Sequence, residues 1–283
     1  MKDWERIREV RPDITDYVIH WVRPKIEEGK YKKPLEILLD VIESGYLKPT
    51  FATRPSIYDR SRRPTIKGPY PAVCFTEQSL ECFIKSCRVL SSHYYPYGIA
   101  LYKMALYHYG GRPIIYGSED ILGTPIQISE SGYELGKEVY KDGLPKDFQY
   151  LWMRYEPLPN LDGYVVDWTH EREWRCRVKI FHDRQLGNTL EEGIPLILPA
   201  VYDNRRNRWI RFLPKILVRS GDERDTVSEV ITELLPAWRE DCQNDYLKAY
   251  FKLLPKVNII ALSELEDNPE ANKLDWMIPE KGS

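Results

Sequence analysis

Hydrophobic and polar residues alternate most regularly in residues 168–180. If this stretch is extended, its side chains point alternately to two faces. One face then carries Trp174, Cys176, Val178 and Ile180, and the other carries Glu171, Glu173, Arg175 and Arg177. We expect Glu173 to lie beside Arg175 and to stay ionised at neutral pH, because a nearby cation favours the charged form. The alternative interpretation is a solvated strand face, where such ion pairs add only about a few tenths of a kcal/mol each.

The first third of the chain predicts two strands and two helices. The β-branched and aromatic residues of 14–22 indicate a strand, with His20 near its end. Apolar residues at helical spacing, with Pro at the start and Gly at the end, predict a helix over 34–45. A short apolar run at 72–76 predicts a buried strand, and the spacing of the apolar residues in 80–87 predicts the helix that follows it.

Strands and short helices continue to alternate along the rest of the chain. Further strands are expected at 99–102, 112–116 and 148–155, a helical turn through residue 107, a hairpin from 194–202 and 208–218, helices at 227–235 and 246–253, and an apolar run at 257–262. The linkers are too irregular for a doubly wound parallel sheet. We therefore predict an α+β fold with a mixed sheet, one domain over 1–220 and a C-terminal helical extension over 221–283 packed on the same core.

Composition narrows the choice of partners only slightly. The chain has 283 residues, with 41 basic against 43 acidic side chains, so its net charge favours no polyanionic partner for the whole chain. Its 20 Tyr and 8 Trp serve equally for filling a core or for stacking on bases. No apolar run reaches about 18 residues and no leader pattern opens the sequence, so we expect a cytoplasmic protein with no membrane contact.

The cysteines predict no metal site. The five cysteines are Cys74, Cys82, Cys87, Cys176 and Cys242. They form no CxxC pair and match no zinc spacing, so we expect them to be reduced and mainly packed in the core.

Residues 50–71 show no periodicity and are strongly basic. Their cations are Arg54, Arg60, Arg62, Arg63 and Lys67, against the single acid Asp59. A connection of this length in a compact domain is usually functional or disordered. We interpret it either as disordered or as a site for a ligand or a nucleic acid.

The order of these segments resembles a known family. The order begins with a His on a first strand, a helix ending in Gly and a long loop. Four short motifs follow in order: Val-Cys-Phe-Thr-Glu at 73–77, Tyr-Gly-Ile-Ala-Leu at 97–101, Gly-Gly-Arg-Pro-Ile-Ile-Tyr at 110–116 and Glu-Arg-Glu-Trp-Arg at 171–175. This order resembles the abortive-infection phage-resistance proteins of the AbiGi type. More distantly it is similar to the ADP-ribosyltransferase fold of bacterial DNA-modifying toxins such as DarT.

The resemblance implies a split mixed β-sandwich with flanking helices that binds NAD as substrate. It implies His20 against the adenosine ribose and Glu173 at the nicotinamide ribose. Glu171 and Glu173 match the Glu-x-Glu word of arginine-modifying transferases, in which the first glutamate handles the acceptor. Thr76 lies where the family has Ser-Thr-Ser, here replaced by Phe-Thr-Glu.

The chemistry of NAD cleavage suggests roles for further residues. A pre-placed carboxylate stabilises the positive charge that develops on the ribose. Arg175, or Arg54 and Arg60, would hold the pyrophosphate through forked hydrogen bonds. Tyr97 would stack on the nicotinamide ring, although Tyr97 and Tyr102 are both eligible for the middle aromatic position.

Two function classes stay open at this point. The first is a mono-ADP-ribosyltransferase or NAD glycohydrolase of bacterial anti-phage defence, with a protein acceptor or a nucleic-acid acceptor at the basic segment. The second is a non-catalytic antitoxin or sensor that binds a cognate toxin, antitoxin or other partner. A strained, prealigned Glu-x-Glu turn and an open cleft would favour the first, and a cleft filled by Trp168 or Trp174 would favour the second. A nuclease lacks the carboxylate and histidine cluster that it would need.

Overall fold

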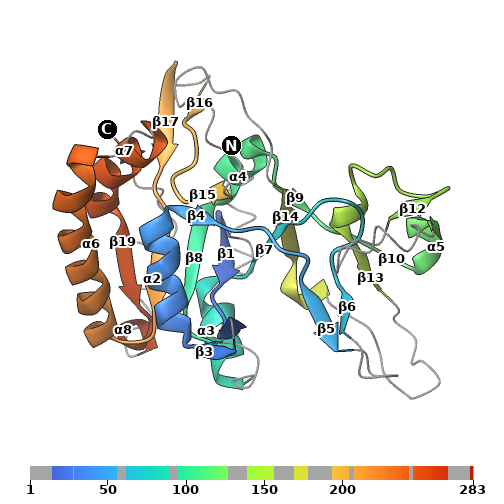
Figure 1. Ribbon diagram of the computed structural model, residues 1–283, viewed down its shortest axis with the longest axis horizontal. Coiled ribbons are helices and arrows are strands. Elements are labelled where there is room, and N and C mark those ends of the chain that lie inside the picture. Colours follow the sequence, from blue (N-terminus) through green and yellow to red (C-terminus); the bar gives the residue numbers. More distant parts are fainter. Residues whose placement is uncertain are drawn as a thin grey trace, which may run out of the picture. The chain divides into compact units, whose positions relative to one another are not determined.

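The computed structural model describes residues 15–27, 29–55, 62–89, 95–126, 139–155, 169–177, 193–203, 207–241, 245–266 and 281–282. These residues fall into two compact units (Figure 1). Unit 1 comprises the described parts of Met1–Leu47, Phe75–Tyr109 and Ile180–Ser283, and unit 2 those of Lys48–Cys74 and Gly110–Lys179. Neither unit begins or ends at residue 220, the boundary that the sequence suggested. The fold class is α+β, as expected.

Unit 1 is built on a mixed sheet. Its strands follow the order β19 (Asn258–Ala261), β18 (Lys215–Val218), β8 (Gly98–Tyr102), β1 (Tyr17–Trp21) and β7 (Val73–Thr76), the last of which begins in unit 2. β1 runs antiparallel to β7 and to β8, β8 runs antiparallel to β18, and β18 runs parallel to β19. The mixed sheet predicted from irregular linkers is therefore confirmed.

The strand predicted from the β-branched and aromatic residues of 14–22 is β1, and its successive side chains point to opposite faces. Tyr17, Ile19 and Trp21 belong to one buried apolar cluster together with residues of α3 (Leu80–Val89). Trp21 packs edge to face on Phe83, with ring centroids 4.7 Å apart. His20 alternates to the other face of the strand.

Helix α2 (Pro34–Ser44) begins and ends where the sequence predicts. Gly45 follows it with a left-handed φ of 73°, a conformation that glycine adopts without steric cost. The last carbonyl groups of a helix have no partner within it. Two tyrosines of α7 (Asp245–Leu253) donate to them, Tyr250 to Ile42 O at 2.7 Å and Tyr246 to Gly45 O at 2.9 Å.

The C-terminal segment contributes more than helices. Between the parallel strands β18 and β19 the chain passes through α6 (Gly221–Asp241) and α7, since parallel strands need a long crossover. The segment expected as a helical extension thus supplies the edge strand β19 to the sheet of unit 1.

Short elements complete unit 1. β2 (Lys25–Glu27) and β3 (Lys30–Lys32) form one hairpin, and β16 (Val201–Asp203) and β17 (Arg208–Phe212) form another. β20 (Lys281–Gly282) pairs with β17, and β15 (Ile194–Pro195) pairs with β4 (Tyr46–Leu47). The short helices are α4 (Lys103–Tyr109), η4 (Leu254–Lys256) and α8 (Leu262–Glu266). The predicted hairpin is confirmed over 201–212. Its outer parts, β15 and β18, pair elsewhere.

Unit 2 consists of short strands and turns around a small core of Ile66, Ala72, Tyr150 and Leu151. Its elements are β5 (Thr53–Pro55), β6 (Arg62–Pro64), β9 (Arg112–Pro113), β10 (Ile115–Gly117), α5 (Glu119–Leu122), β11 (Thr124–Pro125), β12 (Tyr140–Lys141), η2 (Gln149–Leu151), β13 (Trp152–Arg154), η3 (Thr169–Glu171) and β14 (Glu173–Cys176). β5 and β6 pair antiparallel, so the basic segment is partly ordered.

The strand predicted over 112–116 is divided at Ile114. β9 pairs antiparallel with β14, and β10 pairs parallel with β13. Ile114 N–H donates to Glu173 O at 3.0 Å between these two pairings.

The extended stretch predicted over 168–180 is wrong in its first part. Thr169–Glu171 forms a 3₁₀ turn, closed by Arg172 N–H donating to Thr169 O at 3.1 Å. Arg172 then adopts a φ of 44°, which redirects the chain into β14. Trp168, Val178 and Ile180 lie outside the described residues.

Candidate functional site

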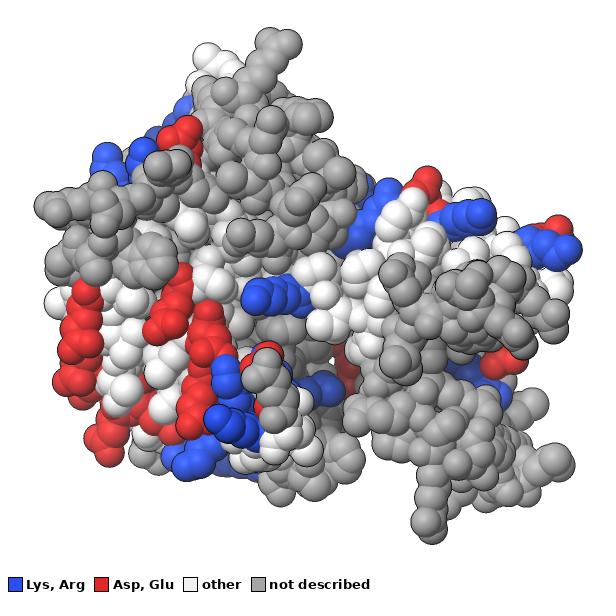
Figure 2. All heavy atoms as spheres, in the orientation of Figure 1, with Lys and Arg blue, Asp and Glu red and all other residues white. Residues whose placement is uncertain are grey.

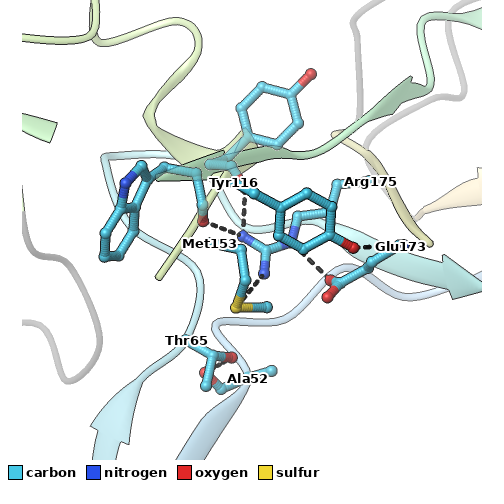
Figure 3. Close-up of polar contacts among 8 residues, drawn as sticks. Ala52, Thr65, Tyr116, Met153, Glu173 and Arg175 are labelled. Atoms are coloured by element: carbon cyan, nitrogen blue, oxygen red, sulfur yellow. Dashed lines mark hydrogen bonds and ion pairs between the residues drawn. The ribbon is translucent and has the colours of Figure 1, made fainter. Parts of the chain in front are cut away.

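Both faces of β14 are buried. Glu173 is 6% exposed, and Arg175 and Cys176 are fully covered. The interpretation of the charged side as a solvated strand face is therefore wrong. The expected neighbourhood is confirmed, since Arg175 Nε donates to Glu173 Oε1 at 2.7 Å (Figure 3).

Arg175 is bonded to the protein through every nitrogen of its guanidinium. Nη1 donates to the carbonyl oxygens of Tyr150 and Trp152 at 2.6 and 2.9 Å, and Nη2 lies 3.9 Å from Met153 Sδ. Figure 3 shows these acceptors around the guanidinium, opposite the Glu173 carboxylate. A buried charge requires such partners. Arg175 therefore positions Glu173 and has no surface left for the pyrophosphate that the sequence assigned to it.

Tyr116 of β10 is the third member of this cluster, and the sequence analysis did not single it out. Its hydroxyl oxygen accepts the Glu173 N–H at 3.4 Å. Burial and the negative charges of Glu173 and Glu171 raise the pKa of Tyr116 to about 12, against the opposing effects of that hydrogen bond and of Arg175. Tyr116 therefore stays protonated and lies within electrostatic reach of both carboxylates. The sequence feature that could have identified Tyr116 is its position in the predicted strand next to Gly-Gly-Arg-Pro.

Cys74 lies against the same ion pair. Burial raises the pKa of its thiol far above the usual range, and the charge of Glu173 raises it further. Since the thiolate is the reactive form, Cys74 is no nucleophile here. Burial lowers the pKa of Arg175, but the pKa is raised overall, chiefly by the charge of Glu173, so Arg175 stays a cation.

The turn between the two glutamates is strained. Arg172 has a φ of 44°, which is uncommon for a residue other than glycine. Such conformations cost about 1–3 kcal/mol and persist only where the surroundings enforce them. Glu171 and Glu173, on either side of Arg172, are 9% and 6% exposed. The Glu-x-Glu motif therefore forms a turn whose conformation the surrounding structure enforces, with two nearly buried carboxylates.

The predicted residues of unit 1 occupy several places on its sheet. His20 contacts Phe75 edge to face with ring centroids 5.8 Å apart, and Thr76 pairs with Ile19 at the end of β7. His20 and Thr76 thus lie on neighbouring strands. After Thr76, Glu77 forms a largely buried ion pair with Lys103 at 2.9 Å.

Tyr97 and Tyr102 lie at opposite ends of β8. With a rise of about 3.3 Å per residue, their backbones are about 16 Å apart. The buried Tyr97 donates to Glu223 Oε1 at 2.7 Å, and Tyr102 stacks on Phe212 with centroids 3.8 Å apart. Tyr97 lies at the end of β8 that is nearer His20, because His20 pairs with Ile99. A compact site therefore includes only one of them.

His20 belongs to unit 1 and Glu173 to unit 2. The shared cleft expected from the resemblance stays a prediction.

The basic segment is described only in part. Arg54 of β5 pairs with Arg63 of β6 in the antiparallel register, next to Arg62. Arg60 lies outside the described residues. Lys67 lies over the Tyr140 ring, 5.9 Å from its centroid.

The part of the chain that the structure describes contains no group of His, Cys, Asp and Glu suited to a metal ion. In the same residues no helix has the length and apolar character needed to cross a membrane. Comparison with models of protein families, with curated proteins and with solved structures finds no match to this chain.

Proposed function

We propose that this protein is an NAD-dependent mono-ADP-ribosyltransferase or NAD glycohydrolase of bacterial anti-phage defence, with Glu173 at the reacting ribose. The observation that carries the proposal is the held Glu-x-Glu turn, with Arg172 at a φ of 44° and Glu173 oriented by Arg175 at 2.7 Å. Strain enforced beside two nearly buried carboxylates is typical of functional sites.

Glu173 would act by electrostatic stabilisation. The bond between the nicotinamide nitrogen and ribose C1′ breaks, and its electron pair leaves with nicotinamide. Positive charge then develops on the ribose, where a fixed carboxylate that accepts the 2′-hydroxyl proton in a hydrogen bond stabilises it. A carboxylate offers about four acceptor sites. The hydrogen bond from Arg175 Nε uses one of them.

Glu171 would serve the second half of the reaction. An acceptor group, or water in the hydrolase, forms the new bond to C1′ and releases a proton. A carboxylate within hydrogen-bond reach takes that proton as a general base. Tyr116 holds its own proton below about pH 12 and is suited to donate a hydrogen bond in this site.

The test is NAD turnover in Glu173→Gln. Gln keeps the size and one acceptor oxygen but removes the charge, so the rate of nicotinamide release should fall about a hundred- to a thousandfold. NAD affinity, measured by calorimetry, should change little. Glu171→Gln should keep nicotinamide release into water and lose labelling of an acceptor.

The control is Glu264→Gln. Glu264 is also a carboxylate in an ion pair, with Arg224 at 2.6 Å, but it lies in unit 1 and outside the segments that carry the resemblance. Its replacement should leave turnover unchanged, and thermal melts of all three variants check folding. Full activity in Glu173→Gln would show that another carboxylate acts, and no turnover by folded wild type with NAD and acceptors would reject the enzyme.

One observation favours the second function, a non-catalytic antitoxin or sensor. The Glu173–Arg175 pair is so well bonded within unit 2 that it has a sufficient structural role. A wild-type protein that binds NAD or a cognate partner without releasing nicotinamide would identify this function.

A further inference from the structure

The hairpin β16–β17 of unit 1 presents an exposed aromatic pair. Trp209 is 68% exposed and Tyr202 is 40% exposed, although both are large apolar rings. They are direct cross-strand partners, and their ring centroids are 5.2 Å apart at 61°. Figure 1 shows the hairpin at one end of the unit. A pair of exposed aromatic rings offers a surface on which a planar group can stack.

The fold holds these rings in place. Val201 and Ile210, the neighbouring cross-strand pair, point to the opposite face and are each 8% exposed. The Tyr202 hydroxyl donates to Asn207 Oδ1 in the turn. β17 also pairs with β20 on its other edge. The register of the hairpin therefore places Tyr202 and Trp209 on its solvent-exposed face. These contacts fix the two rings before any ligand binds.

The same hairpin is strongly basic. Residues 203–211 contain four arginines, Arg205, Arg206, Arg208 and Arg211, against the single acid Asp203. Arg208 is exposed beside Trp209. Arg211 lies two residues from Trp209 and so on the same face of the strand. Among the described residues, Arg211 Nε has no hydrogen-bond partner although it is buried.

We propose that β16–β17 binds single-stranded nucleic acid, with a base stacked on Trp209 and a phosphate held by Arg211 on the same face of β17. Aromatic rings flanked by cations are the usual means of binding single strands, since every base offers a π-face. The bases of a duplex are stacked on one another and are unavailable to Trp209. This site is in unit 1 and is distinct from the basic segment of 50–71, and it does not depend on NAD turnover.

The charge distribution of unit 1 favours a polyanion at this hairpin. Figure 2 shows acidic side chains gathered over α2 and α6. The exposed acids there include Glu36, Asp40, Glu43, Glu229 and Glu233. A polyanion is repelled by that surface, whereas the arginines of the hairpin attract it.

The hairpin β2–β3 provides a contrast within the same unit. Tyr31 is 62% exposed and lysines surround it. Lys25 and Lys32 share the carboxylate of Glu27, at 3.1 and 3.2 Å, and Lys32 also pairs with Asp40 at 2.8 Å. β2–β3 therefore offers an exposed aromatic ring beside paired lysines rather than arginines, and Tyr31→Ala is the control for the loss of an exposed ring.

The experiment is fluorescence anisotropy of labelled 20-nucleotide oligothymidylate, oligouridylate and a duplex of equal length, titrated with the full chain at several salt concentrations. Wild type should bind the single strands more tightly than the duplex, with an affinity that falls as salt rises. Trp209→Ala should weaken binding at least about fivefold, and Trp209→Phe should keep most of the affinity, since a stacking surface remains. Arg211→Gln should lower the salt slope by about 0.7.

Tyr31→Ala should bind as wild type does, and circular dichroism melts check that each variant folds. Equal affinity for the duplex, or equal binding by Trp209→Ala and Tyr31→Ala, would overturn the proposal. Absence of binding by wild type at low salt would overturn it too. In that case, a change of apparent mass of Trp209→Ala in size-exclusion chromatography would identify the hairpin as a contact between copies of the chain.

Discussion

β1 in unit 1 and β14 in unit 2 are both buried strands, but different interactions hold them. β1 places Tyr17, Ile19 and Trp21 into an apolar cluster, where burial of area supplies the stability. β14 buries Glu173 and Arg175 instead, and these depend on each other and on two backbone carbonyls. Apolar packing weakens gradually when an atom is removed. A buried ion pair fails as a whole, because the remaining charge is left without a partner.

Arg175→Met should have the largest effect on stability. It leaves the Glu173 carboxylate buried without its cation, which typically costs about 3–5 kcal/mol. The free energy of unfolding from urea denaturation, followed by tryptophan fluorescence, measures it. The control is Arg177→Met. Arg177 pairs with the 61% exposed Asp147 at 2.8 Å and lies over the Tyr70 ring, 4.5 Å from its centroid. Each of these contacts at a partly exposed site contributes about 1 kcal/mol or less.

The double variant Glu173→Leu/Arg175→Met tests whether the pair acts as a unit. It buries no unpaired charge, so we expect it to be more stable than Arg175→Met alone. A double variant less stable than either single variant would show that the two side chains contribute independently, and the contrast with β1 would then fail.

Ile19→Val should have a smaller effect. The side chain is fully buried in β1, and deletion of one methylene from a core typically costs about 0.5–1.5 kcal/mol. Because no charge is involved, the loss should be the same in low and high salt. A clear salt dependence of this loss would mean that β1 also depends on electrostatic interactions.

A separate effect should appear at alkaline pH. The pKa of Tyr116 is about 12 in the folded protein, above the value near 10 expected after unfolding. The folded state therefore binds more protons between these values. The stabilisation is complete below about pH 10 and is lost as pH rises through about 12.

Tyr116→Phe has no proton to lose at this position. Its stability should fall less steeply than that of wild type between about pH 10 and 12, as measured by urea denaturation at each pH. Identical slopes would show that Tyr116 does not titrate within the cluster.

Local patterns predicted the elements whose signals lie within a few residues. The strand over 14–22 and the helix over 34–45 appear as β1 and α2. Their signals act within one element: β-branched and aromatic residues for the strand, and helical spacing with a proline at the start and a glycine at the end for the helix. The hairpin over 201–212 follows from two strands on either side of a polar turn. Glu173 was expected beside Arg175 because residues two apart on a strand share a face.

Which residues cover each face of a strand depends on contacts between segments that are far apart in the sequence. Arg175 is buried because carbonyl groups 25 and 23 residues earlier in the chain accept its hydrogen bonds. Tyr116 reaches Glu173 across 57 residues, and Tyr250 caps α2 across 208 residues. Side-chain alternation specifies two faces but not their environments, because the environment is formed by distant segments that pack only in the folded chain. The sequence therefore predicted that Glu173 and Arg175 are neighbours. Only the tertiary structure decided that both are buried and that Tyr116 and Cys74 lie against them.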